Sequence, residues 1–337
     1  MKKAKIGVIG AGGIATSVHM PSLAEIKDCE VVAICDLREE RANKLAAAYG
    51  VKKTYTVYHD MLKNEEMDAV YVLVNPDCTF RVADDCMKAG FNVMIEKPLG
   101  LDSYQAHSLV RTAKATGRIA AVAMNRRHIP LIKEVMKRVK EATEITEIDG
   151  RFMKYCDIAE CWNYESAYNC DIVHAVDLVR HIAGAEPVSA ATVVKNFNSP
   201  VDNAWSSVME FENGIIGTLR ANYQSAARIH DFEIHGPNAC AFINIGFADI
   251  GCEATIMYNG GTQIYSAAST GVGNFRIEKL NGIEIAGGDK YYQYYGYKTE
   301  DEDFIDCVLN GKTPLCSAED AAKSMDMVEL LLKSKVN

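Results

Sequence analysis

The 337-residue sequence lacks any run of about 18 consecutive apolar residues, which is the length that a membrane-spanning helix needs. Near the N-terminus it lacks the long apolar segment and small-residue cleavage site of a secretory signal, because a glycine-rich turn follows the first short apolar run. Internal repeats and low-complexity segments are also missing. These absences predict a cytoplasmic protein with no membrane partner.

Basic residues do not outnumber acidic residues either. The chain has 36 Lys and Arg against 45 Asp and Glu, which gives a formal net charge of −9. Phosphate backbones require a basic face, so nucleic acid is not an expected partner. Apolar residues make up 48% and charged residues 24% of the chain, as in an ordinary globular protein, and the length suits two domains.

The eleven cysteines contain no Cys-x-x-Cys pair. Cys156, Cys161, Cys170 and His174 have the donor types of a Cys3His zinc site, but their spacings are irregular. Without an export signal the thiols are expected to be reduced and mostly buried. We therefore expect no metal.

The pattern of residues 1–124 alternates short apolar runs with helical segments. The expected strands are 5–9, 30–35, 69–74, 92–95 and 119–124, and the expected helices include 38–49, 77–89 and 103–117. This alternation predicts an α/β Rossmann domain, a doubly wound parallel sheet that binds NAD(P).

After residue 124 the pattern changes. Alternating strand-like segments dominate residues 125–337, with helices expected at 129–142, 171–183, 299–310 and 317–334. Glu212-Asn213-Gly214 lies between two such segments and indicates a hairpin. We expect an α+β domain with a large, mostly antiparallel sheet that shapes the substrate pocket and forms the oligomer.

The first turn of the chain carries a nucleotide-binding pattern. Gly10, Gly12, Gly13 and Ile14 belong to a G-x-G-x-x-A sequence that follows a strand and opens a helix. The first glycine permits the tight turn, and the second lets the backbone approach a pyrophosphate at the helix N-terminus.

Asp36 ends the second predicted strand, where a carboxylate can accept hydrogen bonds from the adenosine ribose. Its charge would repel a 2′-phosphate, which favours NAD over NADP. Arg38 and Arg41 follow closely and could offset that repulsion. Further along, strand 92–95 runs into Glu96-Lys97-Pro98, which places an ammonium at the carboxyl edge of the sheet, where ligands bind.

In order and spacing these motifs resemble the Gfo/Idh/MocA oxidoreductase family, named for glucose–fructose oxidoreductase and inositol dehydrogenase. The resemblance spans almost the whole chain and rests on the glycine-rich turn, His19-Met20-Pro21, Asp36, Asp68-Ala69-Val70-Tyr71, Glu96-Lys97-Pro98-Leu99, His174-Ala175-Val176-Asp177, Phe211-Glu212-Asn213-Gly214 and Glu233-Ile234-His235-Gly236. Glu-Lys-Pro is the most specific of them.

The resemblance implies hydride transfer between nicotinamide C4 and a carbon of a sugar, polyol or cyclitol. Lys97 would bind and polarise the reacting oxygen, and His174 would exchange the hydroxyl proton. Asn75 and Pro76, where the family has a Thr-Pro-Asn turn, would border the nicotinamide ribose. Glu96 and Lys97 would also bind the cofactor. The family also has a cis Lys–Pro bond in many members and forms homodimers or homotetramers.

One position departs from the family. Its pattern has Asp four residues before the catalytic His, and here that position is Cys170, while Asp171 comes one residue later. Asp171 either reaches the site from the first helical turn or only caps the helix. The departure favours one alternative to a dehydrogenase, a non-catalytic nucleotide- and sugar-binding regulator. A third possibility is an enzyme that retains its cofactor and transiently oxidises a sugar to enable elimination or hydrolysis.

Overall fold

The computed structural model describes residues 3–156, 167–246, 251–260 and 275–336. By compactness the chain divides into two units, each built from several segments. The first unit contains residues 1–129, 168–174 and 290–329, and the second contains residues 130–167, 175–289 and 330–337. In the described part of the chain, no helix combines the length and the apolar character that a bilayer crossing requires.

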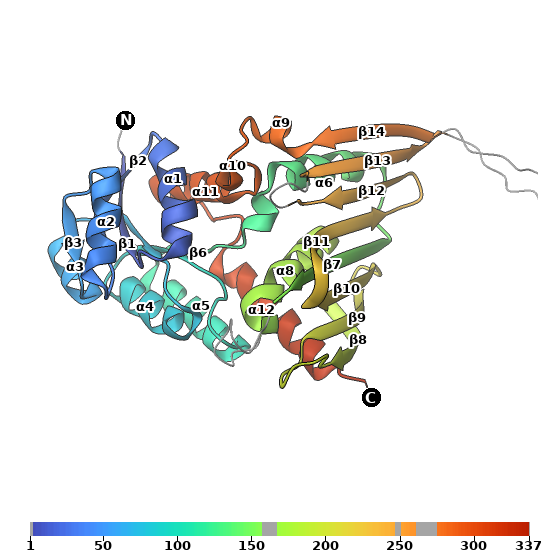
Figure 1. Cartoon of the computed structure of the whole chain (residues 1–337), viewed down its shortest axis with the longest axis horizontal. Helices are drawn as coiled ribbons and strands as arrows, with labels where there is room; N and C mark the ends of the chain where they lie inside the picture. The colour runs from blue at the N-terminus through green and yellow to red at the C-terminus, as the bar shows by residue number, and fades with distance from the viewer. Residues whose placement is uncertain (1–2, 157–166, 247–250, 261–274, 337) are drawn as a thin grey trace, which may run out of the picture. The chain divides into compact units, whose positions relative to one another are not determined.

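The first unit is built on a six-stranded parallel sheet (Figure 1). Its order is β3-β2-β1-β4-β5-β6, made by β1 (Ala4–Ile9), β2 (Cys29–Cys35), β3 (Lys53–Tyr55), β4 (Ala69–Val72), β5 (Asn92–Ile95) and β6 (Ala120–Val122). Every residue of β4 and all but Lys5 of β1 are buried, as expected for strands covered on both faces. This is the predicted doubly wound order, in which successive strands are added on one side of β1 up to β3 and on the other side from β4 onward.

The helices of this unit follow the strands. They are η1 (Ala15–His19), α1 (Met20–Glu25), α2 (Glu39–Tyr49), α3 (Tyr58–Asn64), α4 (Pro76–Lys88), α5 (Ser103–Thr116), η2 (Asn125–His128), η3 (Tyr168–Ile172), α10 (Tyr291–Tyr294), α11 (Tyr297–Asn310) and the greater part of α12 (Ala318–Lys333). Helices α4 and α5 pack against each other, and α2 covers β2 and β3 (Figure 1).

The second unit contains an eight-stranded sheet of order β14-β13-β12-β11-β7-β10-β9-β8. Its strands are β7 (Glu147–Tyr155), β8 (Pro187–Lys195), β9 (Ala204–Phe211), β10 (Ile216–Asn222), β11 (Gln224–His235), β12 (Ala239–Asn244), β13 (Glu253–Asn259) and β14 (Phe275–Asn281). Among the described strand pairs of this sheet, β7 and β10 pair in parallel and the others are antiparallel, so the sheet is mostly antiparallel, as predicted. The expected hairpin joins β9 to β10, with Gly214 at a φ of 82°.

One face of this sheet is covered by helices. Helix α6 (Pro130–Ala142) packs on β12 and β13, and α9 (Gly282–Ala286) packs on β14. Helix α8 (Val173–Ala183) lies over β7, because a side chain at Gly150 would meet Val179 of that helix.

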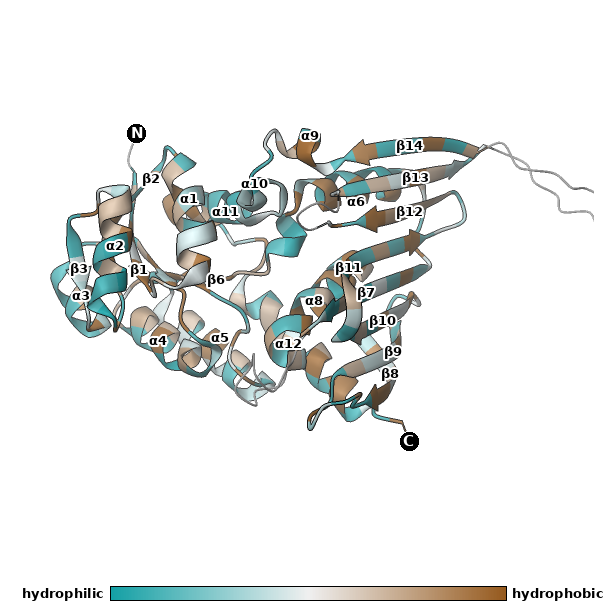
Figure 2. Cartoon of the chain, in the orientation of Figure 1, coloured by the Kyte–Doolittle hydropathy of each residue, from teal (hydrophilic) through white to brown (hydrophobic). Residues whose placement is uncertain are grey.

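The other face of the sheet carries exposed apolar side chains. Buried positions alternate with more exposed ones along β12 and β13. Figure 2 shows brown hydrophobic bands on β12 and β14. The strand register places these exposed residues on one face: Val193, Val208, Ile216, Phe242 and Ile277. Charged residues separate these apolar side chains on the same face, among them Asp149, Arg151 and Glu233.

Candidate active site

The glycine-rich turn connects β1 to the first helix. Gly10 has a φ of 103°, and a Cβ there would overlap the carbonyl oxygen of Leu73, so the turn requires glycine at this position. A Cβ built on Gly12 or Gly13 meets no protein atom within 4 Å. The space over these two glycines is therefore open, as a bound pyrophosphate would need.

Asp36 is anchored across this turn. Its Oδ2 accepts a hydrogen bond from the backbone N–H of Ala11, and its Oδ1 accepts one from the N–H of Arg38, both over 2.8 Å. Each carboxylate oxygen has a second lone pair that can accept a hydrogen bond from a ribose hydroxyl. The structure thus brings Asp36 and the glycine-rich turn together, as the sequence predicted.

A cavity of about 480 Å³ lies beside this turn. It is lined by Ala11, Gly12, Gly13, Thr16, Arg41, Lys44, Leu45, Ala48 and Tyr49. Arg41 lines the cavity from α2, whereas Arg38 does not belong to its lining and is the exposed residue that precedes α2. An apolar wall with two cations at its rim fits the adenosine half of a dinucleotide.

Two further predicted residues follow β4. Asn75 precedes α4, and its carbonyl oxygen accepts hydrogen bonds from the backbone N–H groups of Cys78 and Thr79. Pro76 is the first residue of α4, a position where the missing N–H of proline costs nothing. Both residues thus lie at the carboxyl edge of the parallel sheet, at the end of β4, which is the strand next to β1.

The Glu96-Lys97-Pro98 turn follows β5 at the same edge. Glu96 is 7% exposed, and its Oε2 accepts a hydrogen bond from the N–H of Lys97 over 3.1 Å. The Lys97–Pro98 peptide bond is cis. The Nζ of Lys97 donates a hydrogen bond to the carbonyl oxygen of Cys170, 2.8 Å away.

The segment before His174 is fastened to the loop after β5. The Nδ2 of Asn169 donates a hydrogen bond to the carbonyl oxygen of Leu101 over 2.8 Å, in addition to the Lys97–Cys170 bond. Residues 168–172 form a turn of π-helix, and α8 continues directly from it. Asp171 and His174 are each 9% exposed. The structure therefore brings Lys97 to the start of the helix that carries both residues.

A buried histidine that the sequence analysis did not assign to the site supports this turn. His19 is fully buried, with its Nε2 3.2 Å from Glu96 Oε1 and its Nδ1 3.0 Å from Asp301 Oδ1. Burial lowers the pKa of His19, but the charge of Asp301 and the hydrogen bonds to both carboxylates outweigh it and raise the pKa well above 6.5. The imidazolium links Glu96 to α11.

The signal for His19 was available in the sequence. It stands in the His19-Met20-Pro21 motif that contributed to the family resemblance, directly after the glycine-rich turn. Its partner Asp301 lies 282 residues away and carries no such motif. The rings of Tyr71 and Tyr297 contact the imidazole edge-on and close its surroundings.

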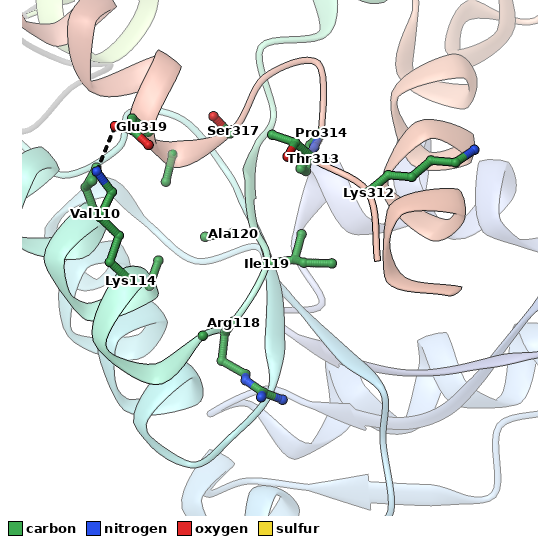
Figure 3. A pocket seen from close by; sticks show the side chains of 13 residues that line it. Val110, Lys114, Arg118, Ile119, Ala120, Lys312, Thr313, Pro314, Ser317 and Glu319 are labelled. Atoms are coloured by element: carbon green, nitrogen blue, oxygen red, sulfur yellow. Dashed lines mark hydrogen bonds and ion pairs between the residues drawn. The ribbon is translucent and has the colours of Figure 1, made fainter. Parts of the chain in front are cut away.

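Other candidate groups do not form part of this site. The pocket in Figure 3 is lined by Val110, Ala113, Lys114, Gly117, Arg118, Ile119, Ala120, Lys312, Thr313, Pro314, Ser317, Ala318 and Glu319, and none of these is a predicted site residue. Of the Cys3His set considered above, Cys161 lies outside the described residues. Cys170 is buried, and its carbonyl oxygen is the atom that Lys97 contacts.

The parallel sheet, the open glycine-rich turn and the anchored Asp36 define a dinucleotide-binding protein of the Rossmann class. The family model "Oxidoreductase family, NAD-binding Rossmann fold" matches residues 4–124, and the GFO/IDH/MocA C-terminal domain model matches residues 170–241. The chain belongs to the Gfo/Idh/MocA oxidoreductase family.

Individual relatives agree with this assignment. An uncharacterized oxidoreductase of Rhizobium meliloti is 28% identical over 80% of this chain and 83% of its own length. The scyllo-inositol 2-dehydrogenase (NAD(+)) of Bacillus subtilis is 24% identical over 96% of this chain and 91% of its own. A solved oxidoreductase from Agrobacterium radiobacter, in complex with NAD+, L-tartaric acid and magnesium, has a TM-score of 0.84 at 16% identity, covering 99% of this chain and 96% of that one. The predicted family, fold class and enzyme class, a dehydrogenase acting on CH–OH groups, are confirmed.

Proposed function

We propose that the protein is an NAD-dependent dehydrogenase that moves a hydride between the nicotinamide and a secondary alcohol or ketone carbon of a sugar, polyol or cyclitol. The observation that carries this proposal is the hydrogen bond from Lys97 to Cys170, because it places the ammonium at the start of the helix with Asp171 and His174. The name of the Bacillus subtilis relative supports the substrate class.

Residues 1–124 are proposed to bind the cofactor. Gly10, Gly12, Gly13 and Ile14 form the turn and helix start for the pyrophosphate, and Asp36 accepts the ribose hydroxyls. Arg38 and Arg41 stand beside the adenosine, and Asn75, Pro76 and Glu96 border the nicotinamide end. Asp36 favours NAD over NADP, because a carboxylate repels a 2′-phosphate.

Three residues are proposed to act on the substrate. A nicotinamide bound here would supply or accept the hydride. Lys97 donates a hydrogen bond to the reacting oxygen and stabilises negative charge that develops on it. His174 takes the hydroxyl proton in the oxidation direction and returns it in reduction. Asp171 places a carboxylate near His174, and residues 125–337 shape the remainder of the pocket.

The exposed face of the eight-stranded sheet supports a homodimer or homotetramer. The apolar residues Val193, Val208, Ile216, Phe242 and Ile277 would be covered by a second copy of the chain. Sedimentation velocity tests this, and a monomer at micromolar concentration would contradict it. A cytoplasmic location is also proposed, because the described cysteines form no disulfide.

NADH absorbance tests the proposed reaction. The protein is mixed with NAD or NADP and a panel of inositols, hexoses, pentoses and alditols, and the ketone forms are assayed in reverse with NADH. We expect turnover of at least one cyclic polyol or sugar, with NAD preferred. NAD binding without turnover in either direction, and without a non-redox product, would leave only a nucleotide-binding regulator.

A further inference from the structure

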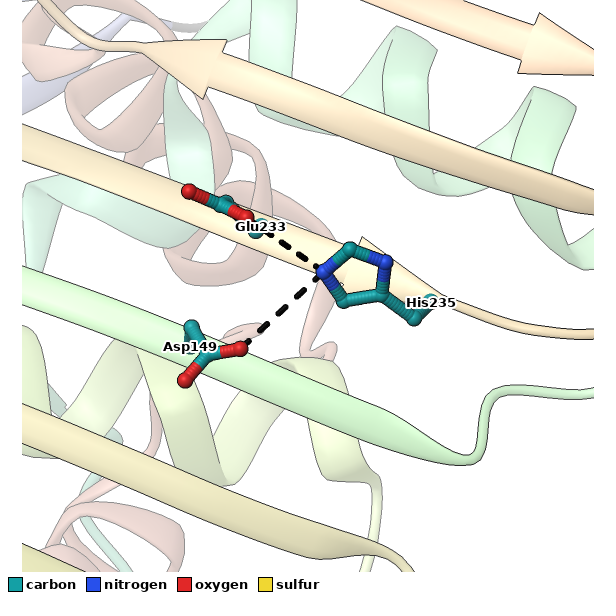
Figure 4. Close-up of side chains that lie close together, drawn as sticks. All are labelled: Asp149, Glu233 and His235. Atoms are coloured by element: carbon teal, nitrogen blue, oxygen red, sulfur yellow. Dashed lines mark ion pairs between the residues drawn. The ribbon is translucent and has the colours of Figure 1, made fainter.

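Three side chains in the second unit form a group that the proposed reaction does not use. They are Asp149 on β7 and Glu233 and His235 on β11, and Figure 4 shows both carboxylates directed at the same imidazole nitrogen. The antiparallel register pairs Asp149 with Glu233, so these two side chains stand on the same face of the sheet, and His235 follows two residues later on that face. Each side chain is about one-third exposed.

The separation of His235 and Glu233 is longer than a direct hydrogen bond and equals the spacing of two ligands around one cation, and the separation of His235 and Asp149 is wider. The Nε2 of His235 lies 3.4 Å from Glu233 Oε2 and 4.0 Å from Asp149 Oδ2. Charge-assisted hydrogen bonds are shorter, about 2.7–2.9 Å. Tetrahedral zinc ligands at about 2.0–2.2 Å from the metal are about 3.4 Å from one another. The three donor atoms lie within 4.8 Å of one another, and no other such group occurs in the described part of the chain.

Each carboxylate is held by its other oxygen. The hydroxyl of Thr218 donates a hydrogen bond to Asp149 Oδ1, which leaves Oδ2 toward His235. The Oε1 of Glu233 lies 3.6 Å from the guanidinium of Arg151, which leaves Oε2 toward His235. Outer contacts of this kind, here one hydrogen bond and one ion pair, orient the ligands of metal sites.

One guanidinium faces three carboxylates, so Arg151 does not cancel the charge of Asp149 and Glu233. Arg151 makes two hydrogen bonds of 2.6 Å to Asp231 and lies 3.6 Å from Glu233, and three negative charges against one positive charge leave a net charge of −2. Asp149 and Glu233 therefore present two negative charges to the imidazole, and a divalent cation would balance both.

We propose that Asp149, Glu233 and His235 bind a divalent transition-metal ion of the zinc class, with water completing the coordination. One imidazole and two carboxylates suit zinc and do not require a thiolate. The ion would join β7 to β11 near the middle of the sheet, on the face that also carries Val208 and Ile216. Its role would be structural, because none of its ligands is a predicted site residue.

Calorimetric titration with Zn²⁺ tests the site in the full-length protein, after treatment with a chelator and in a reducing buffer. We expect His235→Asn to lose one zinc per chain or to bind zinc at least about tenfold more weakly. Thr218→Val should weaken zinc binding by about tenfold, because the outer hydrogen bond to Asp149 is lost. The double variant Asp149→Asn/Glu233→Gln gives a second test if His235→Asn folds poorly.

His107→Asn is the matched control, because His107 lies 3.0 Å from the carboxylate of Asp326 but belongs to no group of three in the described residues. It should titrate like the unmodified protein. Zinc should also raise the melting temperature of the unmodified protein and not that of His235→Asn. Identical titrations for His235→Asn and the unmodified protein, or an equal loss in His107→Asn, would overturn the proposal. None of these results depends on dehydrogenase activity.

Discussion

The ammonium of Lys97 donates a hydrogen bond to the carbonyl oxygen of Cys170, although 73 residues separate them in the chain. The bond orients the ammonium beside the π-helical turn that precedes His174. An ammonium carries three N–H donors in a tetrahedral arrangement, so fixing one donor fixes the directions available to the others. The backbone of residue 170 can therefore position the lysine whatever side chain that residue carries.

Lys97→Met tests this role. We expect kcat to fall by about 10²–10³-fold, because methionine has a similar shape but donates no hydrogen bond to the developing oxyanion. NAD affinity, followed by NADH fluorescence, should change little. Lys88→Met is the control, since Lys88 is an exposed partner of Asp84 outside the site. Unaltered turnover in Lys97→Met would remove the lysine from the reaction.

The two glycines of the first turn should respond differently to alanine. Gly10→Ala forces a Cβ into the Leu73 carbonyl at positive φ, and we expect the free energy of unfolding to fall by at least about 2 kcal/mol. Gly12→Ala meets no protein atom, so unfolding in urea should be nearly unchanged. NAD affinity should nevertheless drop at least about tenfold, which is a loss of about 1.4 kcal/mol. Equal NAD affinity for Gly12→Ala and the unmodified protein would argue against pyrophosphate at this turn.

Asp36→Asn removes the negative charge of this residue and keeps one of its two backbone hydrogen bonds. The amide oxygen can still accept from the N–H of Ala11, whereas the amide NH2 cannot accept from the N–H of Arg38. Removing the negative charge should weaken NAD and strengthen NADP, and the ratio of the two dissociation constants should shift toward NADP by about tenfold. Fluorescence titrations with both reduced cofactors measure the ratio. Asp60→Asn on α3 serves as a control for a general charge effect.

The strands of the first unit could be predicted because burial on both faces leaves continuous apolar runs such as β4. The edge strand β3, Lys53–Tyr55, was not predicted, because it has three residues and none of them is buried. Periodicity gives no signal for so short a segment. The hairpin at Gly214 was predicted because positive φ restricts the residue type there.

The candidate site was only partly visible in the sequence. Asp36 and Lys97 follow strands directly, so their position at the sheet edge is a local property. The pairing of His19 with Asp301 is not local, because it depends on α11 joining the first unit from the far end of the chain. No spacing rule links residues 282 positions apart. The backbone contact of Cys170 is likewise independent of its side-chain type.

His19→Asn should destabilise the protein strongly. It removes the buried cation between Glu96 and Asp301 and leaves their charges without this partner, which costs about 3–5 kcal/mol for buried pairs. Urea unfolding measures the change. His59→Asn is the control, because His59 is an exposed partner of Asp85 and its loss should cost less than about 1 kcal/mol. Similar losses in both variants would show that His19 does not act as a buried cation.

The pH dependence of stability gives an independent test of the charge on His19. The pKa of His19 in the folded protein is raised well above 6.5, so the folded state holds this proton at pH values where the unfolded chain has released it. The stabilisation is therefore complete below pH 6.5 and is lost as the pH rises toward the folded pKa. One proton corresponds to a slope of up to about 1.4 kcal/mol per pH unit. The other titrating groups are common to the unmodified protein and His19→Asn. The difference in unfolding free energy between the two proteins should therefore shrink with this slope above pH 6.5. A difference that is constant with pH would mean that His19 is neutral in the folded state.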